Sequence, residues 1–100
     1  MDKKHTIENY RKELALIDAE LISLLHQRAK MSEHIAEVKF ATNAKIKQAR
    51  IWSAFNRLRN NEAKKLGLDK KLFSKIFKLI HKDSIKIQKN KFKELRKNEK

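Results

Sequence analysis

The sequence contains no cysteine, no proline and only one glycine among its 100 residues. The absence of cysteine excludes disulfides, thiolate nucleophiles and zinc–thiolate sites. Without proline, and with glycine confined to Gly67, almost nothing along the chain interrupts a helix. Alternating strand-like patterns are also missing, whereas Leu, Ile, Ala, Lys and Glu are abundant. The composition therefore predicts an all-α fold, with residues 1–100 as a single domain.

Long hydrophobic runs are also missing, since no segment approaches the roughly 20 apolar residues that a membrane span requires. The N-terminal residues Asp2, Lys3, Lys4 and His5 lead into an amphipathic segment rather than the apolar core of a secretion signal. We therefore expect a cytoplasmic protein. The four histidines, at positions 5, 26, 34 and 81, are too scattered to suggest a metal site.

The charge is strongly positive, with 26 Lys and Arg against 12 Asp and Glu and a formal net charge of +14. Such a balance suggests anionic partners, which include nucleic acid, acidic lipid and small polyanionic substrates. No base-reading motif accompanies the charge, so we favour a solvated lysine-rich surface over nucleic-acid binding. The segment from Lys82 to Lys100 is especially basic, and its residues from about 90 onward are expected to fray.

The first part of the chain carries the apolar spacing of one long helix, from a Thr6 N-cap to about Phe40. Such a helix is about 50 Å long, at 1.5 Å per residue. That length exceeds what a compact monomer of this size accommodates, so we expect its apolar seam to contact another chain. The seam alternates steps of three and four residues: Ile7, Tyr10, Leu14, Ile17, Leu21, Leu24, Arg28, Met31, Ile35 and Val38.

Two shorter helices follow a loop at 41–47. The second helix is expected from about Gln48 to Lys65, with Gly67 ending it in a left-handed cap. Asp69 is placed to cap the third helix. The apolar side of the second helix holds Ile51, Trp52, Phe55 and Leu58, and that of the third holds Leu72, Phe73, Ile76, Phe77, Ile80 and Ile85.

Arg28 interrupts the seam where the pattern requires an apolar residue. A buried arginine costs several kcal/mol unless it is paired and fully hydrogen-bonded. It therefore either sets the register of the helices, as single polar seam residues do, or binds an anionic ligand. Ser32, Ile35 and Lys39 follow it at helical spacing, so two cations and a hydroxyl share one side of the helix. Such a side resembles the wall of a pocket for a small dianion.

Three other polar residues are candidates for the same pocket. Ser84 and Gln88 stand four residues apart on one face of the third helix, although an exposed role is the simpler explanation for each alone. Arg11 lies 17 residues before Arg28, about 25 Å along the axis and about 100° around it. One helix cannot direct both arginines at one small ligand. Two antiparallel helices in a dimer could, with Arg11 of one chain serving the site of the other.

Two segments, YRKELALIDAELISLLHQRAKMSEHIAEVK and LFSKIFKLIHKDSIKIQ, resemble the all-helical AroQ class of chorismate mutases. The resemblance extends from about Thr6 to Gln88. It implies an intertwined helical homodimer with two sites, each receiving Arg11 from the partner chain. It also implies a place in the shikimate pathway of aromatic amino acid biosynthesis.

The resemblance further implies residue roles. Arg28 and the partner's Arg11 would clamp the two substrate carboxylates, and Ser84 would contact a carboxylate. Lys39 and Gln88 would face the ether oxygen, so Lys39, Gln88 and Arg28 are the implied catalytic residues. Arg50 resembles an arginine at the start of the family's second helix. The implied Claisen rearrangement needs no nucleophile, metal or cofactor, only positioning and stabilisation of developing charge.

The sequence departs from the family at Ile51, where many mutases have a glutamate that binds the ring hydroxyl. Isochorismate-pyruvate lyases share the fold, the clamp arginines, the lysine and the glutamine, and have an apolar residue at this place. Ile51 therefore favours a lyase that makes salicylate and pyruvate, whereas Ser84 within DSIKIQ favours a mutase. We expect chorismate mutase, with the lyase as the alternative and a mutase of an amino-substituted chorismate as a third member of the group.

Two readings outside this chemistry stay open. A basic helical module that binds nucleic acid would tolerate exchange of Arg11, Arg28, Lys39 and Arg50 for other cations. An inactive relative could regulate or dock onto another shikimate-pathway enzyme. Retention of several costly pocket cations argues against the inactive relative.

Overall fold

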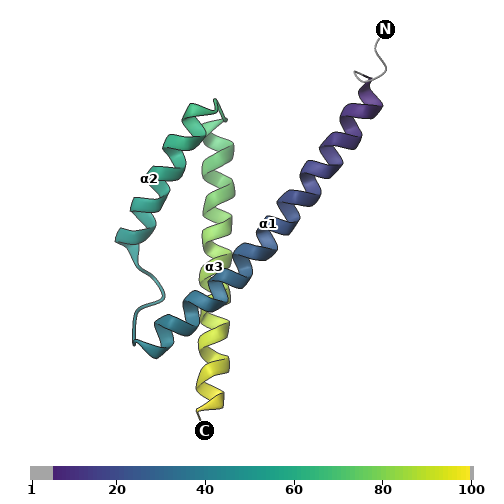
Figure 1. Ribbon diagram of the computed structural model, residues 1–100. Coiled ribbons are helices and arrows are strands. Elements are labelled where there is room, and N and C mark those ends of the chain that lie inside the picture. The colour runs from purple at the N-terminus through teal and green to yellow at the C-terminus, as the bar shows by residue number, and fades with distance from the viewer. Residues whose placement is uncertain (1–5, 100) are drawn as a thin grey trace. The chain divides into compact units, whose positions relative to one another are not determined.

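The structure is a computed structural model that describes residues 6–99, and this part of the chain contains three α-helices and no strand. Figure 1 shows α1 (Ile7–Ala41), α2 (Ala49–Lys65) and α3 (Lys70–Asn98). The predicted all-α fold with one long and two shorter helices is confirmed in class and order. None of the described helices is both long and apolar enough to cross a bilayer.

The chain divides into two compact units, one of residues up to Met31 and one from Ser32 onward. The first unit is the N-terminal part of α1. Thr6 caps it as predicted, because the backbone N–H of Asn9 donates to Thr6 Oγ1 at 3.2 Å. The apolar seam of this unit is exposed throughout, with Leu24 leaving 54% of its surface accessible, and Arg28 is exposed with it. The expected contact of this seam with another chain stays a prediction.

The second unit contains the end of α1, together with α2 and α3. Ala36 of α1 is completely buried and Ser32, one turn earlier, is nearly so. Small side chains at this spacing let α1 and α3 approach closely, and Ser32 Oγ lies 2.7 Å from Ser84 Oγ of α3. The rings of Phe40 and Phe92 then pack edge to face with centroids 5.3 Å apart.

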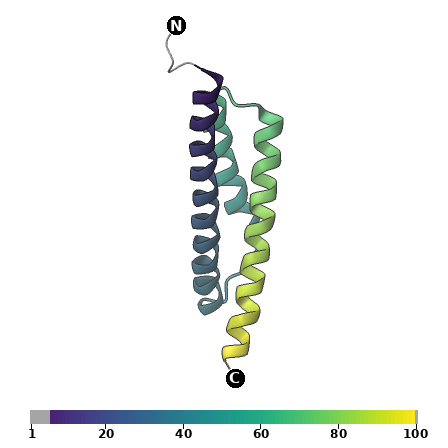
Figure 2. The same ribbon diagram turned by 90° about the vertical axis from the view of Figure 1, so that its right-hand side faces the viewer.

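The C-terminal part of α3 was expected to fray from about residue 90, and this stays a prediction. α3 continues to Asn98 and is unbroken in Figure 2. Phe92 packs this segment against Phe40. In addition, the Lys91 ammonium lies 3.4 Å from a Glu94 carboxylate oxygen and 3.9 Å from one of Glu37. These contacts tie the segment to the end of α1.

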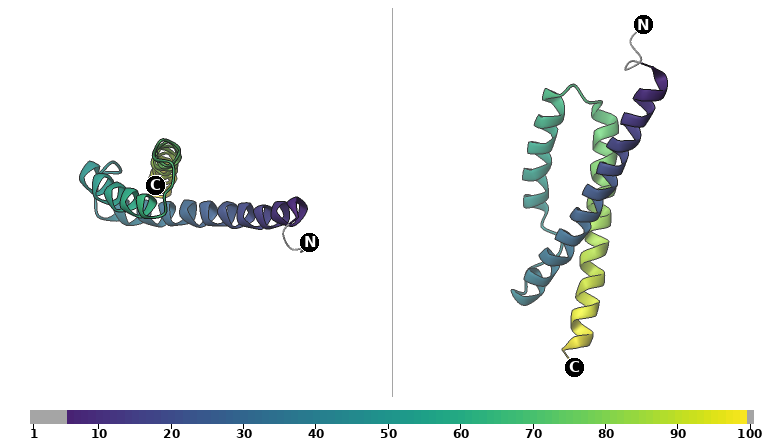
Figure 3. Two further views of the ribbon diagram at one scale, coloured as in Figure 1. Left: turned by 90° about the horizontal axis from the view of Figure 1, so that it is seen from above. Right: turned by 45° about the vertical axis from the view of Figure 1, so that its right-hand side comes forward.

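A tight turn joins α2 to α3, and Figure 3 shows the two helices extending from it side by side as an antiparallel pair. Gly67 has φ +70°, the left-handed conformation predicted for it. The Leu68 N–H donates to the Ala63 carbonyl at 3.0 Å and the Gly67 N–H to the Lys64 carbonyl at 3.1 Å. This is a Schellman cap. Asp69 occupies the N-cap of α3 as predicted, but its side chain makes no capping hydrogen bond.

An aromatic cluster holds α2 against α3. The Arg59 guanidinium lies over the rings of Trp52 and Phe77, 5.3 and 4.8 Å from their centroids, and the His81 ring is 4.6 Å from that of Trp52. The predicted apolar side of α2 is only partly used in this packing. Its other members, Ile51, Phe55 and Leu58, are exposed.

We expect Gly67→Ala to lower the free energy of unfolding by about 1 kcal/mol, because an L-residue is strained in the left-handed region. An added Cβ would meet no atom within 4 Å, so the cost comes from the backbone alone. Urea unfolding followed by circular dichroism measures it, with Ser53→Ala at an exposed site of α2 as the control. Equal stability of Gly67→Ala and the wild type would show that the turn relaxes without cost.

Candidate active site

Four side chains and one backbone carbonyl form a continuous hydrogen-bonded line in the second unit. Lys39 Nζ donates to the Ile46 carbonyl at 2.6 Å and to Gln88 Oε1 at 2.8 Å. Gln88 Nε2 donates to Ser84 Oγ at 3.2 Å, and Ser84 Oγ lies 2.7 Å from Ser32 Oγ. We call this line, from Ile46 to Ser32, the polar chain. It brings together three predicted site residues, Lys39, Ser84 and Gln88, from two helices.

The end of α1 positions the Lys39 ammonium. Asn43 adopts φ 57°, and the Ala44 N–H donates to the Lys39 carbonyl at 2.8 Å, so the backbone reverses immediately after the helix. This reversal returns the loop toward α1, where the carbonyl of Ile46 meets the Lys39 side chain. Asparagine is among the few residues that adopt the left-handed conformation readily. A local turn therefore fixes one of the two acceptors of the ammonium.

Two side chains of the polar chain are buried. Gln88 is only 4% exposed and Ser32 only 7%. Buried polar groups of this kind are costly unless hydrogen-bonded, and each of these side chains has a partner. Ser84 and Gln88 are one turn apart on α3, so their side chains lie on one face and bond to each other.

The chemistry of the donors fixes the direction of the hydrogen bonds. An ammonium donates only, so the amide oxygen of Gln88 must face Lys39 and the amide nitrogen must face Ser84. An ammonium has three protons and an amide nitrogen has two. The hydrogen bonds of the polar chain use two protons of Lys39 and one of Gln88. Lys39 Nζ and Gln88 Nε2 thus each retain one proton for a further acceptor. Both nitrogens lie next to the amide oxygen of Gln88.

Burial also lowers the pKa of Lys39 below its ordinary value of 10.5, because desolvation disfavours the charged ammonium. Within residues 6–99, no carboxylate forms an ion pair with Lys39, and both of its hydrogen-bond acceptors are neutral. The site therefore carries a positive charge whose counter-charge would come from a bound anion.

The other predicted site residues lie elsewhere in the chain. Arg11 and Arg28 belong to the first unit, where both are exposed on α1. Arg50 is exposed in the first turn of α2, next to the exposed Ile51. The geometry of the polar chain therefore bears on Lys39, Ser84 and Gln88, and the predicted roles of the three arginines remain predictions.

Two groups of the polar chain were not among the predicted site residues. Ser32 was noticed on the side of α1 that carries Arg28 and Lys39, but its bond to Ser84 joins residues 52 positions apart. Its four-residue spacing from Arg28 was the available signal. The Ile46 carbonyl left no signal, because every residue has one. In the described part of the chain, no group of His, Cys, Asp and Glu is arranged to hold a metal ion.

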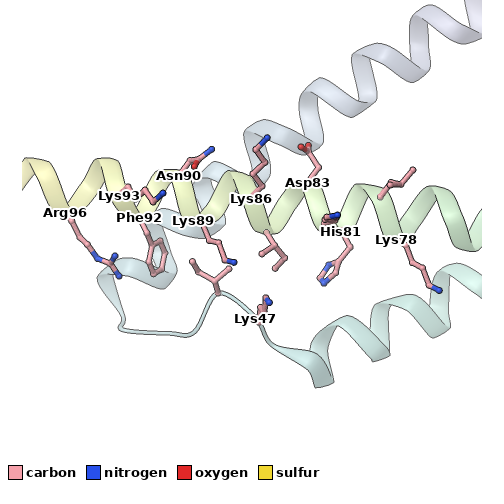
Figure 4. A pocket seen from close by; sticks show the side chains of 14 residues that line it. Lys47, Lys78, His81, Asp83, Lys86, Lys89, Asn90, Phe92, Lys93 and Arg96 are labelled. Atoms are coloured by element: carbon pink, nitrogen blue, oxygen red, sulfur yellow. The ribbon is translucent and has the colours of Figure 1, made fainter.

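A groove of about 1060 Å³ borders the polar chain and shares Ile46 with it. Figure 4 shows Lys89 and His81 projecting from α3 toward the loop that carries Lys47. The lining is strongly basic, with one carboxylate, Asp83, against seven cations: Lys47, Lys78, Lys82, Lys86, Lys89, Lys93 and Arg96. A groove lined by charges of one sign concentrates ligands of the opposite sign, here anions.

Residues 10–89 match the model of a protein family described as chorismate mutase type II. Neither the curated proteins nor the solved structures gave a significant match. The family match includes all five residues of the polar chain and the three arginines.

We expect Lys39 to lose its proton at a lower pH than a fully solvated lysine does, because burial destabilises the ammonium. The titration of its side-chain nitrogen by NMR measures this pKa. Gln88→Leu should lower the pKa of Lys39 further, since it removes an acceptor that stabilises the charged form. Ser53→Ala should leave it unchanged. A midpoint of 10.5 or above in the wild type would contradict the desolvated environment described for this amine.

Proposed function

Because the chain belongs to the chorismate mutase type II family, we propose that it converts chorismate to prephenate at a site built around Lys39 and Gln88. One observation supports this site above the others: Lys39 Nζ and Gln88 Nε2 are held in one partly buried network and each retains a donor proton. Two donors so placed suit a single oxygen that gains negative charge.

The rearrangement is intramolecular. The ether carbon–oxygen bond breaks as a carbon–carbon bond forms, and the electrons stay within the substrate, so no acid, base or nucleophile is required. The enzyme must hold the compact reactive conformer and stabilise the charge that develops on the ether oxygen. Lys39 supplies a cation and Gln88 a neutral amide for that oxygen. Both remain donors at neutral pH.

The two carboxylates of chorismate need cations. We assign one to Arg28 of the same chain and the other to Arg11 of a partner chain in a homodimer, with Ser84 as a further contact and Arg50 as a further cation. The exposed seam of α1 supports a dimer, since Tyr10, Leu14 and Leu24 each leave about half of their surface accessible. In this proposal residues 1–100 act as one catalytic domain in the cytoplasm, with neither nucleic acid nor membrane as a partner.

Isochorismate-pyruvate lyase activity is the second candidate, and Ile51 favours it. An apolar side chain beside Arg50 offers no hydrogen bond to the ring hydroxyl of chorismate. The bond between Ser84 and Gln88 favours the mutase, because it places a hydroxyl donor beside the amide that faces the ether oxygen. The two activities draw on the same polar chain, so direct assay must separate them.

We expect the purified protein to form prephenate from chorismate far more efficiently than it forms salicylate and pyruvate from isochorismate. Lys39→Ala should lower kcat/KM on chorismate by at least about 100-fold, since it removes charge stabilisation in the transition state. Arg28→Lys should also be severe, because an ammonium does not reproduce a bidentate clamp. Activity in the wild type should fall at alkaline pH as Lys39 loses its proton, in the direction of its lowered pKa.

Product analysis by liquid chromatography on both substrates decides the reaction, with Lys12→Ala on the exposed first part of α1 as the matched control. Efficient salicylate formation without prephenate would assign the lyase instead. Full activity in both Lys39→Ala and Arg28→Lys would refute the proposed site.

A mixing experiment tests the donation of Arg11 across the dimer. Arg11→Ala and Arg28→Ala should each be inactive alone, because every site then lacks one clamp residue. Subunit exchange gives heterodimers in which one of the two sites has both arginines, so about a quarter of wild-type activity should return. Mixing Arg28→Ala with Lys39→Ala serves as the control, since both residues act within one chain and no intact site forms. Failure of the first mixture to regain activity would contradict donation by the partner.

A further inference from the structure

Ser32 is a buried hydroxyl in the middle of a long helix, a place where serine is less favourable than alanine. Serine costs helix stability relative to alanine by about 0.5 kcal/mol, in part because its hydroxyl competes for backbone groups. The next buried residue on the same side of α1, Ala36, shows that a small apolar side chain fits against α3. Packing alone therefore does not require a hydroxyl at position 32.

The hydroxyl of Ser32 contacts a residue that already has a partner. Ser84 Oγ accepts from Gln88 Nε2 at 3.2 Å and lies 2.7 Å from Ser32 Oγ. A hydroxyl has one proton and two acceptor sites. Gln88 fills one acceptor site of Ser84, so Ser84 retains one acceptor site and its own proton. The direction of the bond to Ser32 decides which of these two stays available to a ligand.

When Ser32 donates, both acceptor sites of Ser84 are filled, and the proton of Ser84 must point to a third group. When Ser84 donates, its proton is used within the protein and it has nothing left for an anion. An anionic ligand beside Ser84 selects the first arrangement, because hydrogen bonds to a charged group are stronger than those between neutral hydroxyls.

We propose that Ser32 is a positioning residue that donates to Ser84 Oγ and so directs the Ser84 proton to a carboxylate of the bound dianion. The inference rests on the proposed function for the identity of that dianion. It assigns Ser32 no contact with the substrate, since its effect passes through Ser84. Two series of hydrogen bonds then converge on Ser84. One runs from Lys39 through Gln88 to Ser84, and the other runs from Ser32 to Ser84.

A double-mutant cycle tests this coupling. Ser32→Ala should weaken chorismate binding about tenfold, as expected for a lost hydrogen bond to a charged group. Ser84→Ala should have a similar effect, and the double variant should be no worse than Ser84→Ala alone, because Ser32 acts only through Ser84. Losses that multiply in the double variant, or unchanged binding in Ser32→Ala, would overturn the proposal.

A matched pair separates the hydroxyl from the packing. Ser32→Thr and Ser32→Val have side chains of nearly the same shape, but only threonine retains a hydroxyl. Both add bulk at the close contact of α1 and α3, so we expect Ser32→Thr to bind chorismate more tightly than Ser32→Val, because only threonine retains the hydroxyl. Equal weakening in both would assign Ser32 to packing alone. Thermal unfolding and circular dichroism identify any variant that does not fold, and Ser53→Ala is the neutral control.

The outcome for Ser32 is distinguishable from that for the proposed function. A wild-type protein that turns over neither chorismate nor isochorismate would refute the proposed function. The same cycle is then measured by NMR titration with succinate, a dicarboxylate that does not react. Coupled loss of succinate binding in Ser32→Ala and Ser84→Ala would still support the positioning role, and independence of the two would overturn it.

Discussion

The hydrogen bond between the Lys39 ammonium and the Gln88 amide oxygen is the constraint on which the rest of the candidate site depends. It links the end of α1 to α3 and sets the orientation of the amide, because an ammonium can meet only the oxygen. Once the amide is oriented, its nitrogen must face Ser84, and Ser84 then lies against Ser32. One ionic donor thereby orders four side chains on two helices.

Local backbone geometry at two turns of the second unit supports this constraint. The left-handed Asn43 reverses the chain so that the Ile46 carbonyl reaches Lys39, and the left-handed Gly67 directs α3 back along α2. The contact between Phe40 and Phe92 then holds α3 against the end of α1, on the same two helices as the polar chain. The basic groove on α3 surrounds the neighbouring loop with positive charge. Turns and packing thus shape the polar chain, and the neighbouring groove adds a surface that attracts anions.

The helices, and the gathering of Lys39, Ser84 and Gln88 in one place, could be predicted from the sequence because their signals are periodic. The spacing of Lys39 on α1 and of Ser84 and Gln88 on α3 follows the helical repeat, and a resemblance to a family supplied the pairing between helices. The bond from Lys39 to the Ile46 carbonyl could not be predicted, since it depends on how a loop of irregular backbone returns. The packing of Phe92 on Phe40 could not be predicted either, because it is a tertiary contact within a segment whose composition is polar.

The partly buried ammonium of Lys39 has neutral acceptors and no carboxylate partner among the described residues. Its partial desolvation opposes folding, and an anion bound beside it, as proposed above, would offset that cost. Any ligand that binds the folded state alone stabilises it in proportion to RT ln(1 + [L]/Kd). A ligand held by Lys39, as proposed above, would therefore also raise the free energy of unfolding and protect the chain against proteolysis of its unfolded state.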